Sequence, residues 1–164
     1  MIKKYYQSIL WFFCALVLLS LGSCDPARKY EKAESEAIAN YLSSNPADTF
    51  KLEPSGLYYR DVVIGTGRSP VMGDTADVVT TGKYLNGTEF YSTAGGADLV
   101  FEVGEGQLIS GFDEGITYMK EGGKATFLIP SKLAYGTQGY YTIPGYTPLL
   151  YDVQLIKVIP GPSK

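Results

Sequence analysis

Val103–Tyr118, with the sequence VGEGQLISGFDEGITY, holds residues whose types and spacing could form a small binding floor. Its glycines predict a turn after a strand, and the turn leads to Leu108 and Ile109 at the start of a short amphipathic run. We predict that this run is a helix and that Phe112, near its beginning, points back toward Leu108 and Ile109. A floor of this kind could hold a small, flat, apolar group.

The composition narrows the chemistry that the chain can perform. It has 164 residues, a formal net charge of −3 and no histidine. A nucleic-acid partner is not expected, because phosphate binding needs a basic surface, and the commonest general base and metal ligand is missing. The glycine pairs at Gly65–Gly67 and Gly104–Gly106 lack the further residues of a nucleotide-binding loop. We therefore expect no cofactor and no metal.

The N-terminus has the features of an export signal. Lys3 and Lys4 precede an apolar run, Ile9–Leu21, which is too short to span a bilayer comfortably. The run ends in Leu21–Cys24, which resembles the bacterial lipobox, where cleavage before the cysteine is followed by acylation. We predict a lipoprotein signal peptide over residues 1–23 and lipid attachment at Cys24. The alternative is an ordinary signal peptide in which Cys24 is incidental.

Lipid attachment would have two consequences. Cys14 would be removed with the signal peptide, so the mature chain would keep one cysteine and no intrachain disulfide. The protein would be held by its lipid at the bacterial cell envelope, and we expect the outer membrane, on its periplasmic face or at the surface. Asp25 influences sorting in some bacteria only, so we leave the leaflet open.

A tether and helical segment is predicted over residues 24–50. Between Asp25 and Ser44, apolar residues recur near a spacing of 3.6, and Asn45-Pro46 is a plausible end. This helix could be a spacer that packs loosely on the domain or lifts it off the membrane. It could instead be a dimerisation or partner-docking helix, and the sequence gives no prediction of oligomeric state.

A domain of strands and turns is predicted over residues 51–164. Strand-forming segments occupy residues 56–64, 75–84, 88–91, 99–103, 124–129 and 149–156. From them we predict about five strands, mostly antiparallel, with one short helix beginning near Phe112. A sheet that wraps its apolar face around that helix would bury both. The fold class is therefore α+β, with a separate N-terminal helix.

Seven motifs then occur in order between residues 65 and 155: GTG-x-x-P-x-x-GD, TG-x-x-x-NGT-x-F, GxGQLISGFDEG, M-x-x-GGKA, AYG, IP and LLYDVQL. Together they resemble the FKBP-type peptidyl-prolyl cis-trans isomerases over residues 56–159. The resemblance implies a twisted antiparallel sheet wrapped around a short helix, which agrees with the pattern of strands. It also implies isomerisation of Xaa-Pro bonds. Together with the predicted export signal, it makes proline-containing exported polypeptides the expected substrates.

That reaction suits a chain without histidine. The barrier to cis/trans rotation about the Xaa-Pro bond is about 18–20 kcal/mol, because the amide loses its resonance when it twists. A dry apolar pocket favours the twisted amide, while a backbone N–H fixes a neighbouring carbonyl. No nucleophile and no proton shuttle are needed.

The resemblance assigns roles to nine residues. Phe112 matches the aromatic floor beneath the proline ring, the Ile109 amide matches the donor to a substrate carbonyl, and Tyr135 matches a hydroxyl donor. The other positions match the walls and rim of a substrate-binding pocket: Phe90, Tyr91, Leu99, Leu108, Ile143 and Tyr151. The alternative for each residue is ordinary core packing, since these types are commonly buried.

The sequence departs from the family pattern at three positions. Thr80 replaces a tyrosine of the wall, Tyr91 replaces an aspartate, and Leu99 stands where an aromatic residue is common. Tyr140 and Tyr141 could rebuild the rim together with Tyr91. A second hypothesis is therefore a catalytically weak chaperone or peptide-binding module, and a third is a purely structural lipoprotein.

Overall fold

The structure is a computed structural model that describes residues 26–162. The chain divides into two units, residues 1–32 and residues 33–164, and helix α2 (Pro26–Ser44) begins in the first and continues into the second. Of the first unit only the opening turns of this helix are described. The predicted signal peptide, with Cys14, and the predicted lipid site at Cys24 lie outside the described residues. No helix in the described range is long and apolar enough to cross a membrane.

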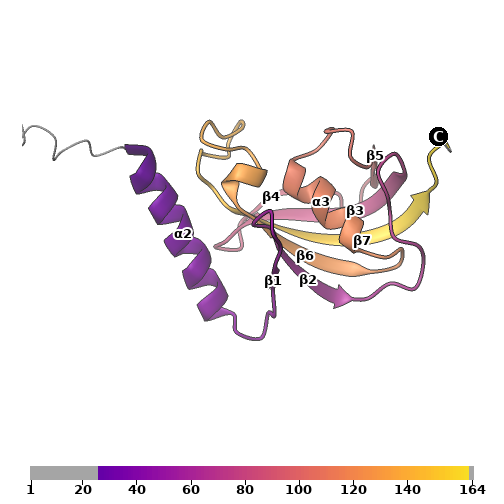
Figure 1. The fold of residues 1–164 in the computed structure, drawn as a ribbon, viewed down its shortest axis with the longest axis horizontal. Coiled ribbons are helices and arrows are strands. Elements are labelled where there is room, and N and C mark those ends of the chain that lie inside the picture. Colours follow the sequence, from indigo (N-terminus) through magenta and orange to yellow (C-terminus); the bar gives the residue numbers. More distant parts are fainter. Residues whose placement is uncertain (1–25, 163–164) are drawn as a thin grey trace, which may run out of the picture. The chain divides into compact units, whose positions relative to one another are not determined.

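The second unit is built on a seven-stranded antiparallel sheet in the order β1-β2-β6-β7-β3-β4 (Figure 1). Strand β5 also pairs with β3, so β4 and β5 follow one another along the same edge of that strand. The strands are β1 (Lys51–Leu52), β2 (Tyr58–Val63), β3 (Thr75–Tyr84), β4 (Glu89–Ser92), β5 (Leu99–Glu102), β6 (Lys124–Ile129) and β7 (Leu149–Ile159).

Helix α3 (Ser110–Tyr118) crosses one face of this sheet (Figure 1). It buries Phe112 and Ile116 in the main core. Glycines allow it to lie close: a Cβ on Gly115 would lie 2.8 Å from the Phe127 ring of β6, and a Cβ on Gly111 would meet β6 in the same way. The sequence therefore places the ring of Phe112 directly against the middle strands.

The opposite face of the sheet is divided into an apolar part and a polar part. In the apolar part, Leu128 of β6 lies opposite Leu150 of β7, and Ile38 of α2 packs against both. Tyr41 and Leu42, one helical turn further along α2, are partly buried beside them. Residues from Ala33 onward thus form a cover for this part of the sheet, and β6 is buried on both faces.

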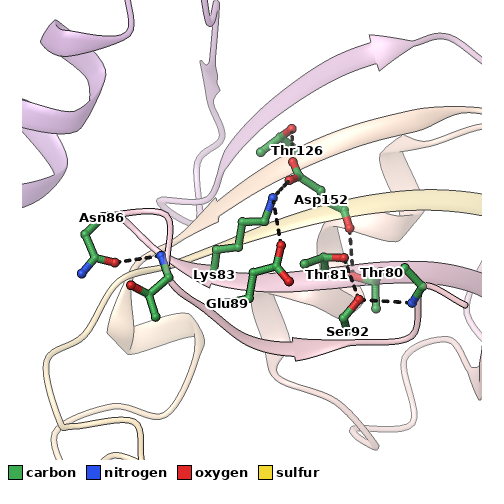
Figure 2. Close-up of polar contacts among 10 residues, drawn as sticks. Thr80, Thr81, Lys83, Asn86, Glu89, Ser92, Thr126 and Asp152 are labelled. Atoms are coloured by element: carbon green, nitrogen blue, oxygen red, sulfur yellow. Dashed lines mark hydrogen bonds and ion pairs between the residues drawn. The ribbon is translucent and has the colours of Figure 1, made fainter. Parts of the chain in front are cut away.

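The polar part lies on the neighbouring strands (Figure 2). Lys83 of β3 lies 3.1 Å from a carboxylate oxygen of Asp152 on β7 and 3.8 Å from Glu89 on β4. The Thr126 hydroxyl of β6 donates to the other Asp152 oxygen at 2.8 Å. The hydrogen bond to Asp152, more than any other contact, raises the pKa of Lys83. Polar side chains on this face and apolar ones on the other fix the register, since a slip of one residue would exchange them.

The predicted fold class is confirmed, but the number and bounds of the strands are corrected. The sheet has seven strands rather than about five, because each of the six strand-forming segments forms a strand and the two-residue strand β1 is added to them. The strand predicted to begin at residue 56 begins at Tyr58, since Gly56 has a φ of +101° in a turn. Strand β7 runs three residues further than predicted, to Ile159, because it pairs with Thr75 at the start of β3. The short helix begins at Ser110, two residues before Phe112.

Candidate active site

A cavity of about 760 Å³ opens between α3, strands β3, β4, β5 and β7, and the loop that precedes β7. All nine residues to which the resemblance gave roles line it. The full lining is Thr80, Phe90, Tyr91, Leu99, Gln107, Leu108, Ile109, Ser110, Phe112, Ala134, Tyr135, Tyr140, Tyr141, Thr142, Ile143 and Tyr151. The structure thus brings together residues that are spread over more than seventy positions of the chain.

Phe112 forms the bottom of this cavity. Its side chain is 2 % exposed, and edge-to-face contacts hold the ring from three sides, with centroids 5.2 Å from Tyr151, 5.7 Å from Phe127 and 5.9 Å from Phe101. Such pairs have a preferred geometry and restrict the ring to one orientation. The floor is therefore rigid and apolar.

Two further rings form a wall beside the floor. Phe90 of β4 meets Tyr151 of β7 edge to face, with centroids 5.8 Å apart. Both rings lie over Gly82 of β3, where a Cβ would come within 2.9 Å of each, so glycine is needed there. Burial, and secondarily the neighbouring Tyr135 hydroxyl, raise the pKa of Tyr151. Its hydroxyl is thus a neutral hydrogen-bonding group at any physiological pH.

The turn before α3 presents a free backbone donor. Ile109 has extended angles, φ −62° and ψ 141°, and its carbonyl accepts the N–H groups of Phe112 and Asp113 at 2.9 and 3.2 Å. Among the hydrogen bonds of the described residues, none uses the Ile109 N–H. Since Ile109 lines the cavity, this donor is available to a bound carbonyl group.

The loop between β6 and β7 supplies the remaining wall. It begins with a 3₁₀ turn, η1 (Ser131–Leu133), and its tip closes through two hydrogen bonds between the backbones of Tyr140 and Ile143, at 2.8 and 2.9 Å. The Tyr140 ring stacks on Tyr135 with centroids 5.0 Å apart and planes 10° apart. Tyr141, at the tip, has a φ of 48° and is 92 % exposed. The tip therefore orients Tyr135 and places Ile143 at the lip of the cavity.

The three departures from the family pattern all lie in the lining. Thr80 is buried, and its hydroxyl donates to the Asp152 carbonyl at 3.1 Å. Tyr91 is 42 % exposed at the rim, and Leu99 is partly buried. No side chain of the lining carries a charge, and no group of residues in the described range could hold a metal ion.

Four lining residues were not singled out by the sequence: Gln107, Ser110, Ala134 and Thr142. Each is the immediate neighbour of a residue that was. Their positions next to Leu108, Ile109, Tyr135 and Ile143 in the sequence could have identified them. The turn before α3 and the loop before β7 both present consecutive residues to the cavity.

Comparison with known proteins identifies the family. The sequence profile of the family described as FKBP-type peptidyl-prolyl cis-trans isomerase matches residues 66–156, which is more than half of the chain. These residues include all nine predicted site positions, which lie on strands β4, β5 and β7, on helix α3, in the turn before α3 and in the loop before β7.

Named relatives agree with this profile. A protein of Neisseria meningitidis named "Probable FKBP-type peptidyl-prolyl cis-trans isomerase FkpA" is 38% identical over 141 residues, which are 80% of this chain and 51% of that protein. An "FK506-binding protein" of the same organism is 41% identical over 105 residues, 63% of this chain and 96% of that protein. The crystal structure of FkpA from Escherichia coli matches with a TM-score of 0.69 and 31% identity, over 96% of this chain and 73% of that one. The chain spans about half, or less, of the length of the first curated relatives that it matches. It belongs to the FKBP-type peptidyl-prolyl cis-trans isomerase family.

Proposed function

We propose that this chain isomerises Xaa-Pro bonds in exported proteins and so assists their folding at the cell envelope. The observation that carries the proposal is the cavity itself: an aromatic floor at Phe112, an uncharged lining and an unused N–H at Ile109. A proline ring has the size and flatness that this floor accepts. Slow proline isomerisation limits folding on the scale of tens of seconds, so a catalyst is useful where chains fold after export.

Each part of the cavity has a task in this reaction. The Phe112 ring supports the proline ring, while Phe90 and Tyr151 restrict its sideways movement. The Ile109 N–H donates to a substrate carbonyl and holds one side of the Xaa-Pro bond. The other side can then rotate about this bond while the peptide as a whole stays in place. The planar amide is more charge-separated than the twisted one, and an uncharged lining therefore favours the twisted state. Tyr135, fixed by its stacking on Tyr140, offers a hydroxyl to the peptide backbone.

The test is a measurement of cis/trans exchange by NMR on a short peptide with one Xaa-Pro bond, with the full chain in mild detergent. We expect the exchange rate to rise in proportion to the protein concentration at low occupancy. A peptide in which alanine replaces proline should neither exchange nor bind in the cavity. Exchange at the uncatalysed rate in the presence of micromolar protein would refute the proposal.

The location at the envelope rests on the lipobox-like Leu21–Cys24 and has its own test. We propose that Cys24 carries the lipid that anchors the protein to the membrane. Growth of the producing bacterium with a fatty acid that carries a chemical tag should label the wild-type chain and leave Cys24→Ser unlabelled. A wild-type chain without label would leave the isomerase proposal intact and remove the anchor.

A second candidate is a peptide-binding module that turns over slowly. The position of Tyr91 favours it, because a half-exposed phenol stands at the rim where the resemblance implies a carboxylate. This candidate predicts peptide-induced chemical shift changes at Phe112 and Tyr135 without faster exchange. Faster exchange in the same titration would exclude it.

A further inference from the structure

Glu34 of helix α2 contacts the loop that carries Tyr135. The Glu34 carboxylate accepts two hydrogen bonds from Ser131, a residue 97 positions away: one from its backbone N–H at 2.5 Å and one from its hydroxyl at 2.7 Å. Ser131 is 5 % exposed. Hydrogen bonds to an ionised carboxylate are roughly twice as strong as neutral ones, and a buried N–H that loses its partner is costly. The contact therefore holds Ser131 firmly.

Ser131 in turn holds the backbone on both sides of Tyr135. Its carbonyl accepts the N–H of Ala134 at 2.9 Å and the N–H of Gly136 at 2.8 Å. Tyr135 lies between these two donors and lines the cavity. The N–H and hydroxyl of Ser131 are thus held by Glu34 of α2, and the carbonyl of Ser131 holds the backbone on either side of Tyr135. These hydrogen bonds connect Glu34 to the position of the Tyr135 ring.

The same 3₁₀ turn also touches the beginning of α3. The Ser110 hydroxyl donates to the Leu133 carbonyl at 3.2 Å, and Ser110 follows Ile109 directly. A displacement of the turn would therefore reach both the tyrosine side of the cavity and the turn that presents the Ile109 N–H.

The attachment of α2 to the sheet does not depend on this contact alone. Ile38, one turn beyond Glu34, is 7 % exposed and packs on Leu128 and Leu150. Burial of this aliphatic side chain stabilises the attachment of α2 independently of the Glu34 hydrogen bonds. Apolar packing and the carboxylate contact can thus be changed separately.

We propose that Glu34 is a positioning residue for the isomerase cavity: its carboxylate sets the conformation of residues 131–136 and, through them, the place of Tyr135. The inference rests on the proposed function of the cavity. It assigns to the helix that precedes the sheet a part in catalysis, although no atom of that helix lines the cavity.

The test compares four substitutions in the full chain. Glu34→Ala removes both hydrogen bonds. Glu34→Gln keeps an acceptor for the N–H and offers an amide donor to the hydroxyl, so it is the conservative rescue. Glu36→Ala removes the same charge from an exposed position two residues further on, and Ile38→Ala weakens the apolar attachment of α2 without touching Ser131.

Two readouts are measured on each variant below its melting temperature: hydrogen exchange of the Ala134 and Gly136 amides by NMR, and kcat/KM for a proline peptide. For Glu34→Ala we expect exchange at both amides to be about tenfold faster, near the lower end of what one lost charge-assisted hydrogen bond contributes. We expect kcat/KM to be about fivefold lower, because only part of this change reaches the Tyr135 side chain. Glu34→Gln should recover most of both, and Glu36→Ala should match the wild type. Ile38→Ala should lower the melting temperature more than it lowers kcat/KM.

Three results would overturn the inference: unchanged exchange at both amides in Glu34→Ala, unchanged kcat/KM despite faster exchange, or an equal loss of kcat/KM in Ile38→Ala, which would assign the effect to helix attachment in general. A wild-type chain without turnover would refute the proposed function. In that case the exchange rates and the affinity for the peptide, measured on the same variants, still decide whether Glu34 positions the loop.

Discussion

Replacement of Phe112 by leucine separates the role of this ring in the cavity from its role in the core. Phe112→Ala would be a poor choice, because truncation of a buried phenylalanine costs about 3–5 kcal/mol. That is a large part of the roughly 5–15 kcal/mol by which a typical domain is stable. Leucine keeps an apolar side chain of similar reach and removes the flat ring.

The expected size of the effect follows from the contacts of the ring. Phe112 meets Phe101, Phe127 and Tyr151 edge to face, and each such pair contributes about 0.5–1.5 kcal/mol beyond the area that it buries. Leucine also packs against these rings, so we expect a net destabilisation of about 1–2 kcal/mol. The contact between floor and proline ring is of the same kind. Its loss in the transition state should lower kcat/KM about threefold to tenfold.

Phe101→Leu is the matched control. Phe101 is 4 % exposed, its ring centroid lies 5.9 Å from that of Phe112, and it does not line the cavity. The same chemical change there should reduce stability by a similar amount and leave most of the turnover. Cis/trans exchange by NMR and thermal unfolding are measured on both variants. Equal losses of kcat/KM in the two variants, or full activity in Phe112→Leu, would refute the assignment of Phe112 as the floor.

Three further predictions follow from close contacts and from one carboxylate. Gly82→Ala would place a methyl group 2.7 Å from the Phe90 ring, so we expect it to displace the wall and lower kcat/KM several-fold in the exchange assay. Gly115→Ala would overlap the Phe127 ring at 2.8 Å and should destabilise the fold by about 1–3 kcal/mol in denaturant unfolding. Two backbone N–H groups, more than the nearby arginine, lower the pKa of Asp74 in the folded state. The ionised Asp74 carboxylate therefore stabilises the folded state fully above its unfolded pKa of about 3.9. This stabilisation is lost as the pH falls through the lower pKa of Asp74 in the folded state. Asp74→Asn should flatten the pH dependence of unfolding in that acid range.

The floor of the cavity could be predicted because its residues are close together in the chain. Leu108, Ile109 and Phe112 belong to one turn and the helix that follows, so local spacing is enough to place them on the same side. Tyr135 and Ile143 are different, since nothing in their own neighbourhood brings them to Phe112. The motif resemblance supplied that information, and without it each could have been core packing.

The bounds of the edge strands were less predictable. β3 has one regular pattern of alternation, but its outer edge pairs first with β5 and then with β4. The change of partner occurs at Thr80, whose N–H bonds to the Thr93 hydroxyl instead of to a strand. This interruption depends on a contact between residues thirteen positions apart, which periodicity does not report.

The pattern of apolar residues in β6 indicates that the second face of the sheet is covered. In β6, Phe127 packs in the main core on the face that α3 covers, so its neighbour Leu128 points to the opposite face. In the sheet Leu128 lies opposite Leu150, and this pair of leucines in the apolar part of the face requires a cover. The apolar stripe of α2 around Ile38 was predicted without a surface to pack on, and the two leucines are that surface. Of the two roles left open for this helix, packing against its own domain therefore has direct contacts to support it. Glu34 lies on α2 one turn before Ile38, and its carboxylate binds Ser131 in the loop that lines the cavity.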